Sequence, residues 1–163
     1  MTESTAKWVF TNLNVYRQIS LEAAAVSAEQ LEKLRRPIPD HPGRFELLQD
    51  PARLGFKNAL ISIVFAGMYI EAMLHFVALE RLPENRRKKT DRLPLEERVQ
   101  ALGVSDPTLL AACMSFREAR KTLVHEKAAS PENLQEMRTA QDESRLAVEL
   151  LIALEAAYGR AAT

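Results

Sequence analysis

The residues ALISIVFAGMYIEAMLHFV, at positions 59–77, decide how this chain folds. The run is nearly all apolar, and it approaches the roughly 20 residues of a membrane-spanning helix. Glu71 and His75 interrupt it, however, and a charged side chain at mid-bilayer costs about 2.5 kcal/mol or more. A helix that is apolar around most of its circumference is also typical of the centre of a bundle or of a dimer interface. We therefore expect a buried helix of a soluble protein and no membrane segment.

The signals on either side of this run predict the ends of the helix. Asp50-Pro51 is a start signal, because an N-cap residue is followed by proline at the first helical position. Pro83 is predicted to stop the helix after Leu82. The next residues, 84–92, are polar and basic and are interpreted as a solvated connection. The alternative is a local patch that attracts phosphate groups. That patch would consist of Arg86, Arg87, Lys88 and Lys89.

Capping signals and apolar spacing predict four further helices, over residues 12–35, 94–102, 107–127 and 130–158. Asp106-Pro107 and Ser130-Pro131 repeat the N-cap and proline signal. Gly103 suits the C-terminal cap of the short second segment. Between the first two helices of the chain, a proline-rich stretch over residues 37–43 predicts an irregular connection.

These elements predict an all-α fold, a helical bundle of about four long helices plus one short helix. The chain has 163 residues, which is the length of one domain, 1–163. Within this domain, residues 1–50 are expected to form an N-terminal helix and the proline-rich linker. Residues 51–158 are expected to form the core bundle.

Charge and cysteine content restrict the classes of function. The 22 basic and 22 acidic side chains cancel, so nucleic-acid binding would have to come from a local patch. The single cysteine, Cys113, cannot form an internal disulfide and is expected to be a buried structural thiol. No cysteine or histidine spacing indicates a zinc site, and no cofactor or metal is expected. The N-terminal residues lack the pattern of a signal peptide, so we expect a cytoplasmic protein.

The segment FREARKTLVHE, residues 116–126, carries the best candidate for chemistry. Arg120 lies five residues before His125. Arginine is a permanent cation that binds phosphate through several N–H donors, and histidine exchanges protons near neutral pH. On a helix, the two residues are separated by about 7.5 Å along the axis and about 140° around it. A shared site would therefore need a ligand that reaches around the helix end, or side chains from a second subunit.

Together with the apolar helix that contains Glu71, this segment resembles the HEPN superfamily. Its members are compact α-helical bundles in which a long apolar helix with an internal acid precedes a helix bearing an Arg-x4-6-His motif. The resemblance covers roughly residues 51–158, and the N-terminal helix is an elaboration. The matching positions of the motif are Arg120, Lys121, Leu123, Val124, His125 and Glu126.

The resemblance implies a metal-independent endoribonuclease that acts as a homodimer, with paired motifs facing each other across a cleft. Some members are toxins that a nucleotidyltransferase-like antitoxin neutralises. His125 would be the general base for the RNA 2′-hydroxyl or the acid for the leaving 5′-oxygen. The reference pKa of a histidine side chain, about 6.5, suits either task. Arg120 would bind the scissile phosphate and stabilise its developing charge.

One departure from the pattern leads to an alternative function. Active members usually carry Asn, Asp or His directly after the arginine, whereas this chain has Lys121, which cannot accept a hydrogen bond. The alternative is a non-catalytic helical module that binds RNA or a protein partner.

Four residues are predicted to support the site: Arg117, Lys121, Glu126 and Glu71. We expect Arg117 to pair with an acid, with a phosphate contact as the alternative. Glu126 is expected to be solvated or to lie opposite a cation. Glu71, in its apolar helix, needs a partner because an unpaired buried carboxylate is costly. That partner is expected to be Arg117 or Arg120, or else His75 one turn further along the helix.

Overall fold

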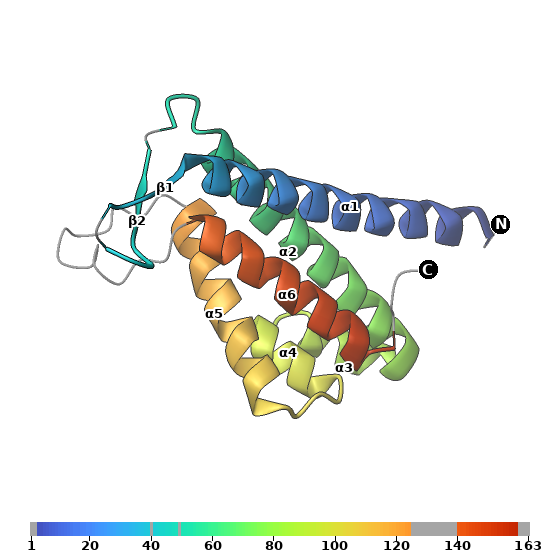
Figure 1. Ribbon diagram of the computed structural model, residues 1–163. Coiled ribbons are helices and arrows are strands. Elements are labelled where there is room, and N and C mark those ends of the chain that lie inside the picture. Colours follow the sequence, from blue (N-terminus) through green and yellow to red (C-terminus); the bar gives the residue numbers. More distant parts are fainter. Residues whose placement is uncertain (1–2, 40, 49, 125–139, 160–163) are drawn as a thin grey trace.

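The computed structural model describes residues 3–39, 41–48, 50–124 and 140–159, and it confirms the all-α fold class (Figure 1). Within these ranges the elements are α1 (Glu3–Leu34), β1 (Arg35–Pro37), β2 (Phe45–Leu47), α2 (Leu54–Arg81), α3 (Glu84–Thr90), α4 (Leu95–Ala101), α5 (Pro107–Val124) and α6 (Ala140–Ala157). The four long helices are α1, α2, α5 and α6. The described residues include two short helices, α3 and α4, rather than the one predicted.

Helix α2 is the central element, as its apolar sequence predicts. Its inner face is fully buried at residues that include Ala59, Ile63, Ala66, Ile70, Met73, Leu74 and Val77. By length and composition α2 is also the one described helix that would pass as a membrane span, with half of the apolar window buried inside the fold. The core helix of a soluble protein passes the same test.

The predicted start of α2 at Asp50-Pro51 is wrong. The helix begins at Leu54, and Arg53 precedes it in the left-handed backbone conformation, with φ of 52° and no side-chain cap. Asp50 still contributes, because its Oδ2 accepts a hydrogen bond from the Gly55 N–H at 3.2 Å. Asp50 therefore does bind a backbone N–H in the first turn of α2, as an N-terminal signal should, but the helix begins three residues after Pro51.

Helix α1 runs antiparallel to α2 and begins earlier than predicted, at Glu3. Ser20 Oγ donates a hydrogen bond to the carbonyl of Ser62, and Ser27 Oγ donates one to the carbonyl of Gly55, both at 3.0 Å. Small side chains at these contacts bring the two backbones close together. Figure 1 shows that the N-terminal turns of α1 diverge from α2.

The proline-rich connection contains a hairpin that was not predicted. Strands β1 and β2 pair in antiparallel fashion, with Arg35 opposite Leu47 and Pro37 opposite Phe45. Gly43, with φ of 81°, supplies the left-handed residue of the connecting loop. The hairpin lies at the end of the molecule where α1 passes into α2 (Figure 1).

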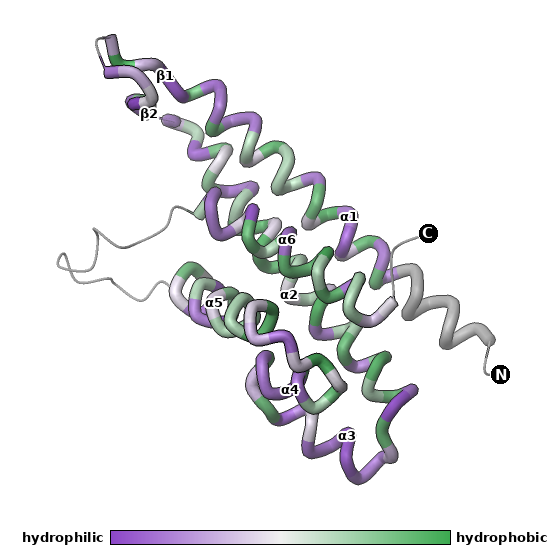
Figure 2. The backbone as a smooth tube through the Cα atoms, turned by 60° about the horizontal axis from the view of Figure 1, so that its bottom comes forward, coloured by the Kyte–Doolittle hydropathy of each residue, from purple (hydrophilic) through white to green (hydrophobic). Residues whose placement is uncertain are grey.

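The predicted solvated connection over residues 84–92 is wrong in its secondary structure. Residues Glu84–Thr90 form α3, which Lys88 and Glu84 support with an i, i+4 ion pair of 2.8 Å. Thr90 is buried, and its Oγ1 donates to the Arg86 carbonyl at 3.0 Å. The segment is polar along its whole length, in contrast to the apolar α2 (Figure 2).

Helix α4 begins and ends close to the predicted signals, and α5 begins at the predicted Pro107. The predicted end of α5, near Lys127, lies outside the described residues. Gly103 follows α4 with φ of 101°, and Asp106 Oδ1 accepts a hydrogen bond from the Thr108 N–H at 2.9 Å. The prediction of a buried thiol is confirmed at Cys113, where burial raises the pKa to about 12. Met114, the next residue on the same helix, is 50% exposed. The predicted start of the last helix, near Ser130, lies outside the described residues.

Candidate functional site

The arginine of the motif lies in a groove between α2, α5 and the turn that joins α3 to α4. The groove has a volume of about 470 Å³. The lining residues are Gly67, Ile70 and Glu71 from α2, Leu93 and Pro94 from the turn, Leu95 from the start of α4, and Phe116, Arg117, Arg120 and Lys121 from α5. Three of the predicted site residues on α5 thus lie in one groove with Glu71. His125 and Glu126 lie outside the described residues.

The guanidinium group of Arg120 lies directly against Gly67. A Cβ atom built on Gly67 would be 2.8 Å from Cζ, 2.9 Å from Nη1 and 3.0 Å from Nε of Arg120. Among the described residues, no carboxylate forms an ion pair with Arg120, although its neighbours Arg117 and Lys121 both have acidic partners. Arg120 therefore offers N–H donors to an anion in the groove.

Arg117 lines the same groove but is neutralised by two acids beside it. Its Nε and Nη2 donate to the two carboxylate oxygens of Glu96 at 3.1 and 3.0 Å. Glu118 lies 3.3 Å from Nη1. The prediction that Arg117 pairs with an acid is confirmed. A phosphate contact from Arg117 would have to compete with this bidentate interaction with Glu96.

Glu71 has a partner, as predicted, but the partner is Arg98 rather than Arg117, Arg120 or His75. Arg98 Nη1 donates a hydrogen bond to Glu71 Oε2, and Nη2 lies 3.3 Å from Asp91 Oδ1. The Arg98 side chain is 8% exposed, whereas the Glu71 side chain is 49% exposed. His75 Nδ1 lies 3.9 Å from the other Asp91 oxygen. Arg98 thus ties α4 and the end of α3 to α2 and holds one side of the groove.

Arg98 was not among the predicted site residues, although the sequence around it indicates its position. In LEERVQAL, residues 95–102, Arg98 is three residues after Leu95 and next to Val99, both of which are buried. The spacing places the arginine at the edge of the core-facing side of a short helix. An acid in the neighbouring apolar helix is the natural counterpart of such an arginine.

Lys121 lies at the open edge of the groove. Its Nζ is 3.8 Å from Glu118 Oε2, and both side chains are more than half exposed. Exposed ion pairs of this kind contribute about 0–1 kcal/mol to stability. Lys121 is therefore free to turn toward an anion at little cost.

The four basic residues of the predicted phosphate patch lie on α3 and do not line the Arg120 groove. Lys88 and Lys89 instead line a second hollow of about 730 Å³, together with Arg92. The Nε of Arg87 is buried and has no hydrogen-bond partner among the described residues. The turn at Leu93–Leu95 connects this basic region with the groove.

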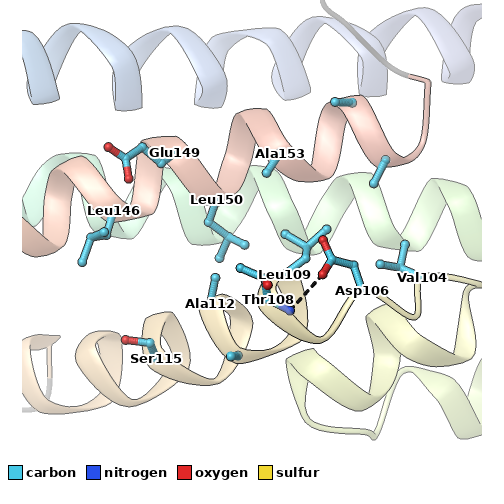
Figure 3. A pocket seen from close by; sticks show the side chains of 13 residues that line it. Val104, Asp106, Thr108, Leu109, Ala112, Ser115, Leu146, Glu149, Leu150 and Ala153 are labelled. Atoms are coloured by element: carbon cyan, nitrogen blue, oxygen red, sulfur yellow. Dashed lines mark hydrogen bonds between the residues drawn. The ribbon is translucent and has the colours of Figure 1, made fainter.

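A third hollow, which was not predicted, lies between α5 and α6 (Figure 3). It has a volume of about 720 Å³. Its floor and walls are mostly apolar and small, and the residues include Leu109, Ala112, Leu146, Leu150, Ala153 and Ala157. Its charged lining residues are the acids Asp106 and Glu149. Because no cation among the described residues lines it, this hollow is not suited to a phosphate group.

Within the described part of the chain, no three or more His, Cys, Asp and Glu residues are arranged to hold a metal ion. Comparison with known proteins finds no family model, no curated protein and no solved structure that matches this chain.

Proposed function

We propose that this chain is a HEPN-like RNA-binding protein in which Arg120 binds a phosphate group of RNA. The observation that carries the proposal is the guanidinium of Arg120, which lies in a groove without an acidic partner among the described residues. An arginine without a counterion attracts an anion, and its planar set of donors matches a phosphate. The basic side chains of α3 extend the attraction toward a polyanion.

We propose further that the protein cleaves RNA without a metal ion, with His125 as the group that moves protons. The RNA 2′-oxygen gives its proton to a base and bonds to phosphorus, while the bond from phosphorus to the 5′-oxygen breaks. The leaving 5′-oxygen takes up a proton, and the products are a 2′,3′-cyclic phosphate and a 5′-hydroxyl. Arg120 stabilises the charge that develops on the phosphoryl oxygens. DNA, which lacks the 2′-hydroxyl, would remain intact.

The active form is proposed to be a homodimer joined through the outward face of α2. Ile61 and Leu79 on this face are 41% and 42% exposed, although both are large apolar side chains. The Arg120 groove lies on another side of the same helix, where Gly67 and Glu71 line it. A second copy placed here would supply the second set of side chains that the helical spacing of Arg120 and His125 is predicted to need.

The alternative function is a non-catalytic module that binds RNA or a protein. Lys121 favours it, because this residue stands where active HEPN proteins usually have Asn, Asp or His, and its ammonium group lies near Glu118. If the chain is a toxin, its proposed partner is a nucleotidyltransferase-like antitoxin. Recovery of a partner that binds away from Arg120 would support the alternative.

The test uses the purified chain, single-stranded RNA and EDTA. We expect cleavage by the wild type, none by His125→Ala, and weakened RNA binding with Arg120→Ala. Arg145→Ala is the matched control, because Arg145 is an exposed arginine on α6 that pairs with Glu149. Equal RNA binding by Arg120→Ala and the wild type would overturn the proposal. Intact RNA with both wild type and His125→Ala, together with weaker binding by Arg120→Ala, would select the non-catalytic alternative.

A further inference from the structure

Gly67 is a buried glycine in the interior of the longest apolar helix. Glycine destabilises a helix interior relative to alanine, because the unfolded chain loses more conformational freedom. The neighbouring core positions of α2 carry alanine, including Ala59, Ala66 and Ala78, which are fully buried. The backbone of α2 therefore has no need of a glycine at this position, and the reason for one lies in what faces it.

The group that faces Gly67 is the guanidinium of Arg120. Three of its atoms lie 2.8–3.0 Å from the place where a Cβ would stand. Carbon atoms do not approach other heavy atoms this closely without a shift of one group. Because the guanidinium is the far end of a flexible side chain, a methyl group at position 67 would displace Arg120 rather than the α2 backbone.

We infer that Gly67 is the positioning residue that lets Arg120 lie flat on α2 at the floor of the groove. This inference rests on the proposed function of Arg120 as a phosphate-binding residue.

The test is a double-mutant cycle on RNA binding and thermal unfolding, with Gly67→Ala, Arg120→Ala and the double variant. We expect Gly67→Ala to weaken RNA binding about tenfold, close to the loss in Arg120→Ala, because a displaced guanidinium loses its phosphate contact. The double variant should bind no more weakly than Arg120→Ala alone. Gly55→Ala is the matched control, since Gly55 is also a buried glycine of α2 but faces Gln141 and Gln30 at 3.3 and 3.4 Å. It should bind RNA like the wild type.

Thermal unfolding separates a positioning role from a structural one. In the Arg120→Ala background the methyl group has room, so the double variant should melt at or above the temperature of Arg120→Ala. A drop in melting temperature of the same size in both backgrounds would show that the conflict is not with Arg120, and would overturn the inference. Wild-type binding by Gly67→Ala, with a loss in Arg120→Ala, would also overturn it while leaving the proposed function intact. No loss in Arg120→Ala would instead overturn the proposed function.

Discussion

Arg17 binds both carboxylate oxygens of Glu155, with Nε 2.6 Å from Oε1 and Nη2 3.2 Å from Oε2. Glu155 is 3% exposed, and Tyr69 Oη donates a further hydrogen bond to Oε1 at 2.6 Å. The hydrogen bond with Glu155 raises the pKa of the Arg17 guanidinium. One buried carboxylate therefore joins α1, α2 and α6, and it fixes how the N-terminal helix packs on the rest of the bundle.

Replacement of this carboxylate by an amide tests the importance of the junction. Glu155→Gln keeps the side-chain size but leaves Arg17 partly buried without a counterion. Removal of one partner of a buried pair costs several kcal/mol, so we expect the free energy of unfolding to fall by about 3 kcal/mol in urea titrations. Glu149→Gln on the same helix is the control, because its pair with Arg145 is exposed and should matter by less than about 1 kcal/mol. Equal losses in the two variants would contradict a special role for Glu155.

Because of Cys113, the free energy of unfolding is expected to fall as the pH rises above 9. Burial raises the pKa of the folded thiol from 9.0 to about 12. Between these values the unfolded chain releases the thiol proton and the folded chain keeps it. The contribution is thus fully present below pH 9 and is lost as the pH rises toward 12. Above pH 9, this group is expected to lower the free energy of unfolding by up to about 1.4 kcal/mol per pH unit.

The measurement compares the wild type with Cys113→Ala in urea titrations at pH 7, 8, 9 and 10. The two proteins differ in this one titratable group, so the difference in their unfolding free energies reports mainly on the thiol. That difference should be constant from pH 7 to 8 and should shrink between pH 9 and 10. A constant difference over the whole range would mean that the thiol ionises normally in the folded protein.

Helices α1, α5 and α6 could be predicted from the sequence because each has apolar residues at a spacing of three and four, and α2 because it is apolar around most of its circumference. The predictions were wrong for segments whose secondary structure does not depend on an apolar face. α3 has no apolar face over residues 84–90, so its helical state depends on the Glu84–Lys88 pair, buried Thr90 and connections at both ends. The strand Arg35–Pro37 is stabilised by pairing with Phe45–Leu47 across the connecting loop, which the signals near the prolines do not reveal.

The candidate site was predictable in its residue types but not in its pairing. Arg117 and Glu71 were both expected to have partners, and both do. The identities of those partners, Glu96 and Arg98, depend on how α4 packs across α2 and α5. A single sequence does not specify that packing, because a seven-residue helix has several ways to place its apolar side. The close approach of Arg120 to Gly67 depends on the same packing.

Two alanines of α6 provide a test of the hollow between α5 and α6. Ala147 is fully buried in the core, whereas Ala153 lines the hollow (Figure 3). Ala147→Leu adds atoms to a filled core and should destabilise the protein by about 1–3 kcal/mol. Ala153→Leu places the same atoms in open space and should change the unfolding free energy by less than about 0.5 kcal/mol. Thermal unfolding of both variants measures the contrast, and a large loss in Ala153→Leu would mean that no such space exists.

The basic side chains of α3 can be tested separately from Arg120, through the salt dependence of RNA binding. Each cation that neutralises a phosphate of a single strand contributes about 0.7 to the slope of log K against log salt concentration, because it releases a bound counterion. Lys89 lines the basic hollow beside Lys88 and Arg92, so Lys89→Gln should reduce the slope by about 0.7 if RNA passes over α3. Lys33→Gln is the matched control, since Lys33 is an exposed lysine of α1 that pairs with Glu29 at 2.6 Å. Fluorescence anisotropy with labelled RNA at several salt concentrations gives the slopes. An unchanged slope in Lys89→Gln would place the RNA path away from α3, even if Arg120 proves to be essential for binding.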